Sequence, residues 1–341
     1  MKVNLGLTPV STRVPLLVLG FASLALGVAG GLVRLGASIP APAGAVALHG
    51  ALMVSGFLGT VIGLERAVAL GRLWAYAAPL ASGLGGVCLL ADYAVAGFVL
   101  MVFAAAVLVA ASAATFARQR SLEMATLFAG AAAWLAGNLF LFAGQPAVPW
   151  WIAFFALTIG GERLELSRYL KRTPAVRFYF LVLAILLLIT PLAPRIMGGV
   201  LLLLALWLFA FDLARVTVRQ RGLPRYIAVC LLSGYAWLAL GGALLAAAVA
   251  YDAALHAIFV GFVFSMVFGH APVILPAVLR VALPYSSVLY LPLALLHVSL
   301  AIRVFVSVGI GAWGNAAAIA LFIATAAALT ITRAGKPRSP R

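Results

Sequence analysis

Four histidines are the side chains of this sequence best suited to chemistry, because they lie in long apolar stretches where ionisable groups are rare. His49 and His256 lie a few residues inside such stretches, whereas His270 and His297 lie near the middle of theirs. A charge at the centre of a membrane helix costs roughly 2.5–3.5 kcal/mol, so titratable residues there are functional candidates. These are the only histidines among 341 residues, and their depths sort them into two pairs.

The first pair, His49 and His256, lies at one depth. If their stretches cross a membrane over residues 45–68 and 253–279, both histidines lie within roughly 6 Å of the outer boundary, at about 1.5 Å per residue. Two opposed neutral imidazoles at one depth suit the axial ligation of a six-coordinate haem iron. The sequence therefore predicts a low-spin haem b near the outer face, held noncovalently because the chain has no C-x-x-C-H motif.

Two arginines are candidates to bind the propionates of that haem. Arg34 ends the first predicted membrane span and Arg303 ends the eleventh, both on the outer side. A guanidinium group suits bidentate contact with a carboxylate. The alternative is that both side chains extend to the lipid headgroups.

The second pair, His270 and His297, is a candidate site for a second metal such as copper. Both histidines fall near mid-depth if the span that contains His270 continues to residue 279. Two histidines alone are few for a metal site, and the alternatives are a hydrogen-bonded polar site or a proton path.

The elements that must position these side chains are membrane helices. The chain is 66% hydrophobic and 9% charged, with a mean hydropathy of +1.19. Backbone groups in hydrocarbon must be satisfied within the segment, and the apolar runs do not alternate as barrel strands do. We predict an all-α, polytopic membrane protein with about twelve spans, over residues 15–36, 45–68, 73–91, 94–116, 123–144, 148–168, 177–193, 196–214, 226–249, 253–279, 285–307 and 311–332.

The basic residues orient these spans. The net charge is +16, but all of the 23 Lys and Arg residues except Arg34, Arg195 and Arg303 fall in loops and tails on one side. This is the positive-inside pattern, so we expect both termini in the cytoplasm, a bacterial-type inner membrane and lipid as the partner of the basic surface. Nucleic acid is not an expected partner.

A sequence repeat suggests how the spans are grouped. The segments "GTVIGLERAVALGRLW" (59–74) and "ALTIGGERLELSRYLK" (156–171) place Glu65 and Glu162 97 residues apart, and "SMVFGHAPVILPAVLR" (265–280) is a third copy without the acid. A period of about 100 residues corresponds to four helices, so we predict three pseudo-symmetric four-helix units, 15–116, 123–214 and 226–332, in one membrane domain, 1–341. Chance similarity among apolar segments is the alternative.

Acidic residues near these sites have predicted structural roles. The Glu-Arg pairs 65–66 and 162–163 are expected to form ion pairs at the inner ends of their spans, either locally or across the bundle. Asp252, four residues before His256, is expected to accept a hydrogen bond from that imidazole and orient it.

Two of these segments resemble a known family. "LHGALMVSGFLGTVIGLERAVALG" (48–71), with His49-Gly50 and Met53, resembles the second helix of the haem-copper oxidase catalytic subunit, and "HAIFVGFVFSMVFGHAPVILP" (256–276) resembles its tenth. Both segments are also similar to the NnrS family of haem- and copper-containing membrane proteins linked to nitric-oxide stress. The resemblance implies twelve helices in three arcs, opposed histidine ligands to a low-spin haem and outer arginines on its propionates.

The chain departs from the oxidase pattern in its sixth and seventh spans, which contain no histidine where the oxidases carry copper ligands. Standard haem-copper oxygen reduction is therefore not expected, and whether the protein is an oxidoreductase stays open. The predicted function is electron transfer or nitric-oxide-related chemistry, with an electron-donor protein or a quinol as partner. The alternative is a cofactor-free secondary transporter or permease, a class that also has twelve spans and internal repeats.

Overall fold

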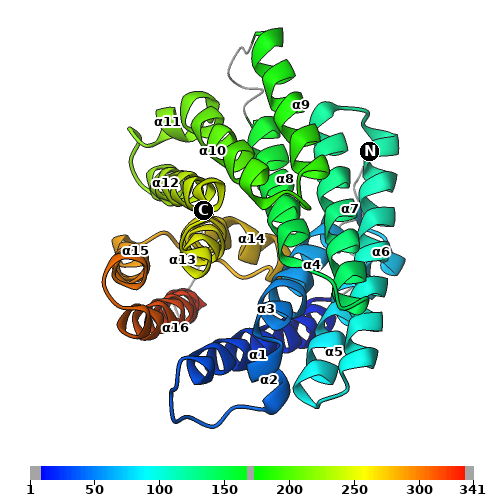
Figure 1. Cartoon of the computed structure of the whole chain (residues 1–341), viewed down its shortest axis with the longest axis vertical. Coiled ribbons are helices and arrows are strands. Elements are labelled where there is room, and N and C mark those ends of the chain that lie inside the picture. Colours follow the sequence, from blue (N-terminus) through cyan, green and yellow to red (C-terminus); the bar gives the residue numbers. More distant parts are fainter. Residues whose placement is uncertain (1–8, 167–172, 335–341) are drawn as a thin grey trace. The chain divides into compact units, whose positions relative to one another are not determined.

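A computed structural model describes residues 9–166 and 173–334, and this part of the chain is helical throughout, with no strand. Its helices are labelled in Figure 1. They form two compact units, of which unit 1 ends at Glu165 and unit 2 begins at Leu166. Each unit is described by itself below.

Unit 1 is built from helices that follow one another through short turns. The first helix, α1, packs against the second span and against α5, and α6 packs against both α5 and α7. The elements are α1 (Val10–Arg34), α2 (Ala43–Ala47), α3 (His49–Ala51), π-helix η1 (Leu52–Gly59), α4 (Thr60–Leu70), 3-10 helix η2 (Leu73–Tyr76), α5 (Ala77–Leu90), α6 (Ala94–Arg118), α7 (Leu122–Phe142) and α8 (Val148–Leu166).

Unit 2 is built in the same way. Helix α12 packs against α10 and against the segment that carries His256, while α15 packs against α16. The elements are α9 (Pro174–Ile189), α10 (Pro194–Phe211), α11 (Ala214–Thr217), α12 (Leu223–Ala247), α13 (Tyr251–His256), π-helix η4 (Ala257–Phe264), α14 (Ser265–Leu279), 3-10 helix η5 (Ser287–Leu289), α15 (Tyr290–Phe305) and α16 (Val308–Ala334).

The all-helical prediction is confirmed, and each predicted span contains a helix. Within residues 9–166 and 173–334, ten helices are long and apolar enough to cross a membrane, which supports a multi-pass membrane protein. The helices that fall short correspond to the predicted sixth and seventh spans. Helix α8 carries Glu162, Arg163 and Glu165 near its end, and α9 has 16 residues, about 24 Å against a hydrocarbon core of about 30 Å.

The predicted grouping into three four-helix units stays a prediction, as does the orientation of the termini. The helices of the predicted middle repeat, 123–214, are divided between the two compact units, because α7 and α8 belong to unit 1 and α9 and α10 to unit 2. Residues 167–168 of the predicted sixth span lie outside the described residues, as do basic residues between α8 and α9 and at both ends of the chain.

The first and last predicted repeats share an order of elements that the sequence comparison did not reveal. In each, a 25-residue helix (α1 or α12) precedes a span interrupted by an eight-residue π-helix (η1 or η4). A 3-10 turn and two further helices follow, α5 and α6 in one repeat and α15 and α16 in the other. The interrupted spans are those that carry His49 and His256.

Local sequence explains where several helices begin and end. Helices α9, α10 and α12 have proline in the first turn, where the missing N–H is not needed. Ser121 caps α7, because its hydroxyl accepts a hydrogen bond from the backbone N–H of Met124 at 3.3 Å. Gly71 ends α4 with φ of 64°, a left-handed conformation that glycine adopts readily.

Each π-helix is accompanied by a serine hydroxyl that satisfies one of its carbonyl groups. In η1, Ser82 of α5 donates to the carbonyl oxygen of Ser55 at 2.5 Å. In η4, Ser265 donates to the carbonyl oxygen of Gly261 at 2.6 Å. A π-turn disturbs the regular i to i+4 bonding of a helix and is frequently found at functional sites. These bonds stabilise the irregular backbone where an unpaired carbonyl would be costly.

Candidate functional site

His49 is the first residue of α3, and its ring lies against one face of α1. Its Nδ1 atom lies 2.6 Å from the carbonyl oxygen of Gly27. A Cβ atom built on Gly31 would lie 2.8 Å from Cε1 of His49, so the ring can approach α1 this closely only because position 31 is glycine. A carbonyl oxygen can only accept a hydrogen bond, so Nδ1 carries the proton and Nε2 keeps the lone pair.

His256 ends α13, directly before η4, and its ring is held in the same tautomer. Its Nδ1 lies 2.8 Å from the carbonyl oxygen of Asp252 and 3.3 Å from the Oδ1 atom of that side chain. The predicted role of Asp252 as the acceptor that orients this imidazole is therefore consistent with the contact. Here too the proton belongs on Nδ1 and the lone pair on Nε2.

Arg303 anchors this arrangement from α15. Its Nη2 atom lies 3.1 Å from Oδ2 of Asp252, and the arginine side chain is buried whereas the aspartate is exposed. Arg303 thus fixes the carboxylate that lies beside the His256 ring. The Nε atom of Arg303 is buried without a hydrogen-bond partner in the described part of the chain. Its predicted contact with a haem propionate remains a prediction.

Arg34 lies in the last turn of α1 and is exposed. Gly27, Gly31 and Arg34 are spaced four and three residues apart, so they share one face of the helix. Because His49 contacts Gly27 and Gly31, Arg34 extends from the same face at the end of α1. That position suits the predicted contact with an anionic group beside His49.

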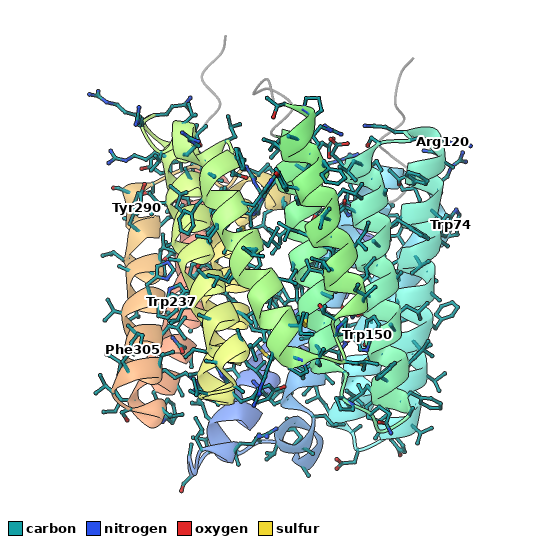
Figure 2. The ribbon with its side chains drawn as sticks, turned by 45° about the horizontal axis from the view of Figure 1, so that its top comes forward. Trp74, Arg120, Trp150, Trp237, Tyr290 and Phe305 are labelled. Carbon is teal, nitrogen blue, oxygen red and sulfur yellow. The ribbon has the colours of Figure 1, made fainter. Side chains whose placement is uncertain are left out.

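His270 and His297 both belong to unit 2, and their ring nitrogens have different partners. Nδ1 of His270 lies 2.8 Å from the carbonyl oxygen of Met266, one turn earlier in α14. Nδ1 of His297 instead accepts a hydrogen bond of 2.9 Å from the indole N–H of Trp237, and the planes of the two rings are nearly parallel, at 14°. Trp237 lies at a depth between those of Tyr290 and Phe305, the two ends of α15 (Figure 2).

This hydrogen bond bears on the predicted copper site. A neutral imidazole whose Nδ1 accepts must carry its proton on Nε2, and in His297 that Nε2 is buried with no hydrogen-bond partner among the described residues. Metal ligation by His297 would therefore require the Trp237 hydrogen bond to break or Nε2 to lose its proton. The part of the chain that the structure describes also contains no group of three or more His, Cys, Asp or Glu side chains able to hold a metal ion.

A buried polar network holds the π-helix η1, which begins three residues after His49 in unit 1. Asn138 of α7 accepts hydrogen bonds from the hydroxyl of Ser55 at 2.9 Å and from the indole N–H of Trp151 at 3.1 Å. Its amide donates to the carbonyl oxygen of Met101 at 3.0 Å, and Trp134 donates to the Ser55 hydroxyl at 3.1 Å. The network joins η1 to α6, α7 and α8, and it was not predicted from sequence.

The Glu-Arg motifs form an ion pair across unit 1. The Nη2 atom of Arg66 in α4 lies 2.5 Å from Oε1 of Glu162 in α8, and about three-quarters of each side chain is buried. Of the two alternatives that the sequence left open for this pair, local pairing or pairing across the bundle, Arg66 uses the second. One copy of the sequence motif thus supplies the cation and the other supplies the anion.

The described helices define the class as an all-α, polytopic protein with many spans. The chain belongs to a family described as a domain of unknown function, DUF8744, whose model matches residues 13–331. No curated protein and no solved structure matches the chain significantly. The resemblance to haem-copper oxidase and NnrS proteins therefore stays a prediction.

Proposed function

We propose that this membrane protein binds haem b noncovalently, with His49 and His256 as axial ligands, and acts in electron transfer or nitric-oxide-related chemistry. One observation supports the proposal most directly. His256 directly precedes an eight-residue π-helix, and His49 lies three residues before another. Each histidine donates its Nδ1 proton to a carbonyl oxygen. Both imidazoles therefore keep the lone pair on Nε2, the nitrogen that a metal would use.

Within each unit, the groups that surround the histidine suit a haem ligand. The backbone carbonyl oxygen of Asp252 accepts from Nδ1 of His256, and the Asp252 carboxylate lies 3.3 Å from the same atom. Both contacts raise the basicity of that ligand, and Arg303 holds the carboxylate in place. Arg34, at the end of the α1 face that His49 contacts, is suited to a propionate. When bound, haem supplies an iron that exchanges single electrons. Neighbouring residues of this chain orient the two histidines and determine which ring nitrogen carries the proton.

A visible absorption spectrum tests the proposal. The full chain is expressed in haem-replete cells, purified in detergent and examined oxidised and reduced, with iron analysis. We expect a Soret band and a low-spin b-type reduced spectrum. His49→Ala and His256→Ala should each lose the low-spin spectrum, whereas His270→Ala, a matched loss of one intramembrane histidine, should keep it.

A second variant separates ligand loss from misfolding. His49→Gly leaves a cavity in place of the ring, and imidazole added to the buffer should restore the low-spin spectrum if the fold is intact. A colourless, iron-free wild-type protein that is folded and monodisperse would refute the haem proposal. That result would favour the cofactor-free permease instead.

A further inference from the structure

A cavity of about 540 Å³ lies at one end of unit 2, and no histidine is among its lining residues. It is bounded by the start of α10, the end of α12 and the turn that leads into α13. Its volume falls within the roughly 300–1,000 Å³ typical of ligand sites. The lining residues are almost all apolar: Ala193, Pro194, Arg195, Ile196, Leu244, Leu245, Ala248, Val249 and Tyr251.

Arg195 is the one charged residue in this lining, and no acidic residue accompanies it. Among the described residues it forms no ion pair or hydrogen bond through its side chain. It also belongs to the first turn of α10, whose initial N–H groups have no partner within the helix and favour a negative charge. Arg195 is exposed, so its charge is accessible to a ligand. A cation without a protein partner and a helix N-terminus that both line an apolar cavity favour an anion with an apolar body.

The residue types around the cavity are typical of a membrane–water interface. Tyr251 contributes an amphipathic ring to the rim, and tyrosine is enriched at that level of membrane proteins. Ile196 and Val249, which also line the cavity, are exposed by 61% and 51%. In a membrane protein these exposed apolar side chains face lipid, so an acyl chain could leave the cavity along them.

We propose that this cavity binds an anionic phospholipid, with the phosphate at Arg195 and the acyl chains against Ile196, Leu244 and Val249. A zwitterionic lipid fits less well, because no carboxylate of the lining is present to pair with its ammonium group. The proposal does not depend on haem binding, so either can fail alone.

Native mass spectrometry with added lipid tests the site on the purified full chain. We expect phosphatidylglycerol to bind more tightly than phosphatidylcholine with the same acyl chains. Arg195→Gln should weaken phosphatidylglycerol binding about tenfold, as expected for the loss of a charge-assisted hydrogen bond, and Arg195→Lys should weaken it less. Arg221→Gln, which removes an exposed arginine beyond the other end of α12, should leave binding unchanged.

Two further measurements test whether the cavity binds a whole phospholipid or only its phosphate group. Ala193→Phe keeps the arginine but fills the cavity, so it should also weaken phosphatidylglycerol binding, and thermal unfolding should confirm that each variant is folded. Inorganic phosphate at the same concentration as the lipid should not displace it. Equal binding of the two lipids by the wild type, wild-type affinity in Arg195→Gln, or displacement by inorganic phosphate would each overturn the proposal.

Discussion

Asn138 lies at the centre of the buried network in unit 1, and its replacement by leucine tests how that unit is stabilised. The side chain is 1% exposed. Leucine has a similar size, so the substitution leaves little cavity but removes both the acceptor of the Trp151 indole N–H and the donor to Met101. The Ser55 hydroxyl also loses its acceptor, although it still accepts from Trp134.

The expected cost follows from the groups left without partners. A buried donor without an acceptor costs about 1–3 kcal/mol, and hydrogen bonds between membrane helices contribute about 0.6 kcal/mol on average. The indole of Trp151 is fixed by packing at 3% exposure and cannot turn toward water. We therefore expect Asn138→Leu to lower the free energy of unfolding by about 1–3 kcal/mol.

A second asparagine provides a matched control. Asn315 of α16 is also buried and donates to Ser299 at 2.6 Å, but its Oδ1 atom has no hydrogen-bond partner in the described part of the chain. Asn315→Leu therefore leaves no donor without an acceptor and removes an unsatisfied oxygen. It should cost less than Asn138→Leu, by about 1 kcal/mol or more.

Unfolding in mixed detergent micelles with increasing dodecyl sulfate, followed by near-ultraviolet circular dichroism, measures these differences. Trp151→Phe in the Asn138→Leu background removes the unpaired donor, so the double variant should be more stable than the sum of the single effects predicts. Additive effects, or a loss in Asn315→Leu as large as in Asn138→Leu, would refute the assignment of the network as the stabilising element.

Two further predictions concern charged contacts. Arg66→Glu and Glu162→Arg should each destabilise the protein by about 1–2 kcal/mol, since the pair is partly buried, and the combined swap should recover most of the loss in the same unfolding assay. If the proposed haem is bound, Asp252→Asn should keep the Soret band, because the backbone carbonyl of Asp252 still accepts from Nδ1 of His256. The haem midpoint potential should rise, because the negative charge 3.3 Å from that imidazole is lost. Asp92→Asn, in an exposed turn, is the control, and an unchanged potential in Asp252→Asn would contradict the electrostatic role of the Asp252 carboxylate.

Much of the fold follows from simple features of the sequence. Apolar runs specify helices because the backbone has no other way to satisfy its polar groups in lipid, and proline and glycine mark several of their ends. The π-helices do not follow from these features. The stretches 52–59 and 257–264 are apolar like their neighbours, and the change in hydrogen-bond register depends on packing and on hydroxyls from outside the turn, as with Ser82.

In the candidate site, contacts between residues close in the sequence could be predicted, whereas contacts between distant residues could not. The contact between Asp252 and His256 is local, at a spacing of four residues on one helix, so the sequence was sufficient. The tautomer of His297 depends on Trp237, 60 residues away, and the acceptor of Ser55 is Asn138, 83 residues away. Such partners are brought together only by the tertiary fold, and no periodicity of the sequence indicates them.

The predicted repeats differ in whether they carry a candidate ligand or contacts that only stabilise the fold. The first and last predicted repeats each keep a histidine at the start of an interrupted span, whereas the corresponding helix of the middle repeat, α8, is a regular helix without histidine. That helix instead contributes Glu162 to the ion pair with Arg66 and Trp151 to the Asn138 network. The irregular backbone therefore occurs where a candidate ligand must be presented, and the regular helix occurs where the repeat only stabilises its neighbours. By this argument, the conversion of η1 to a regular helix would turn the residues before it relative to those after it, and His49 would lose its contact with α1. Ser55, which lies within η1, would also shift relative to Asn138 and Trp134.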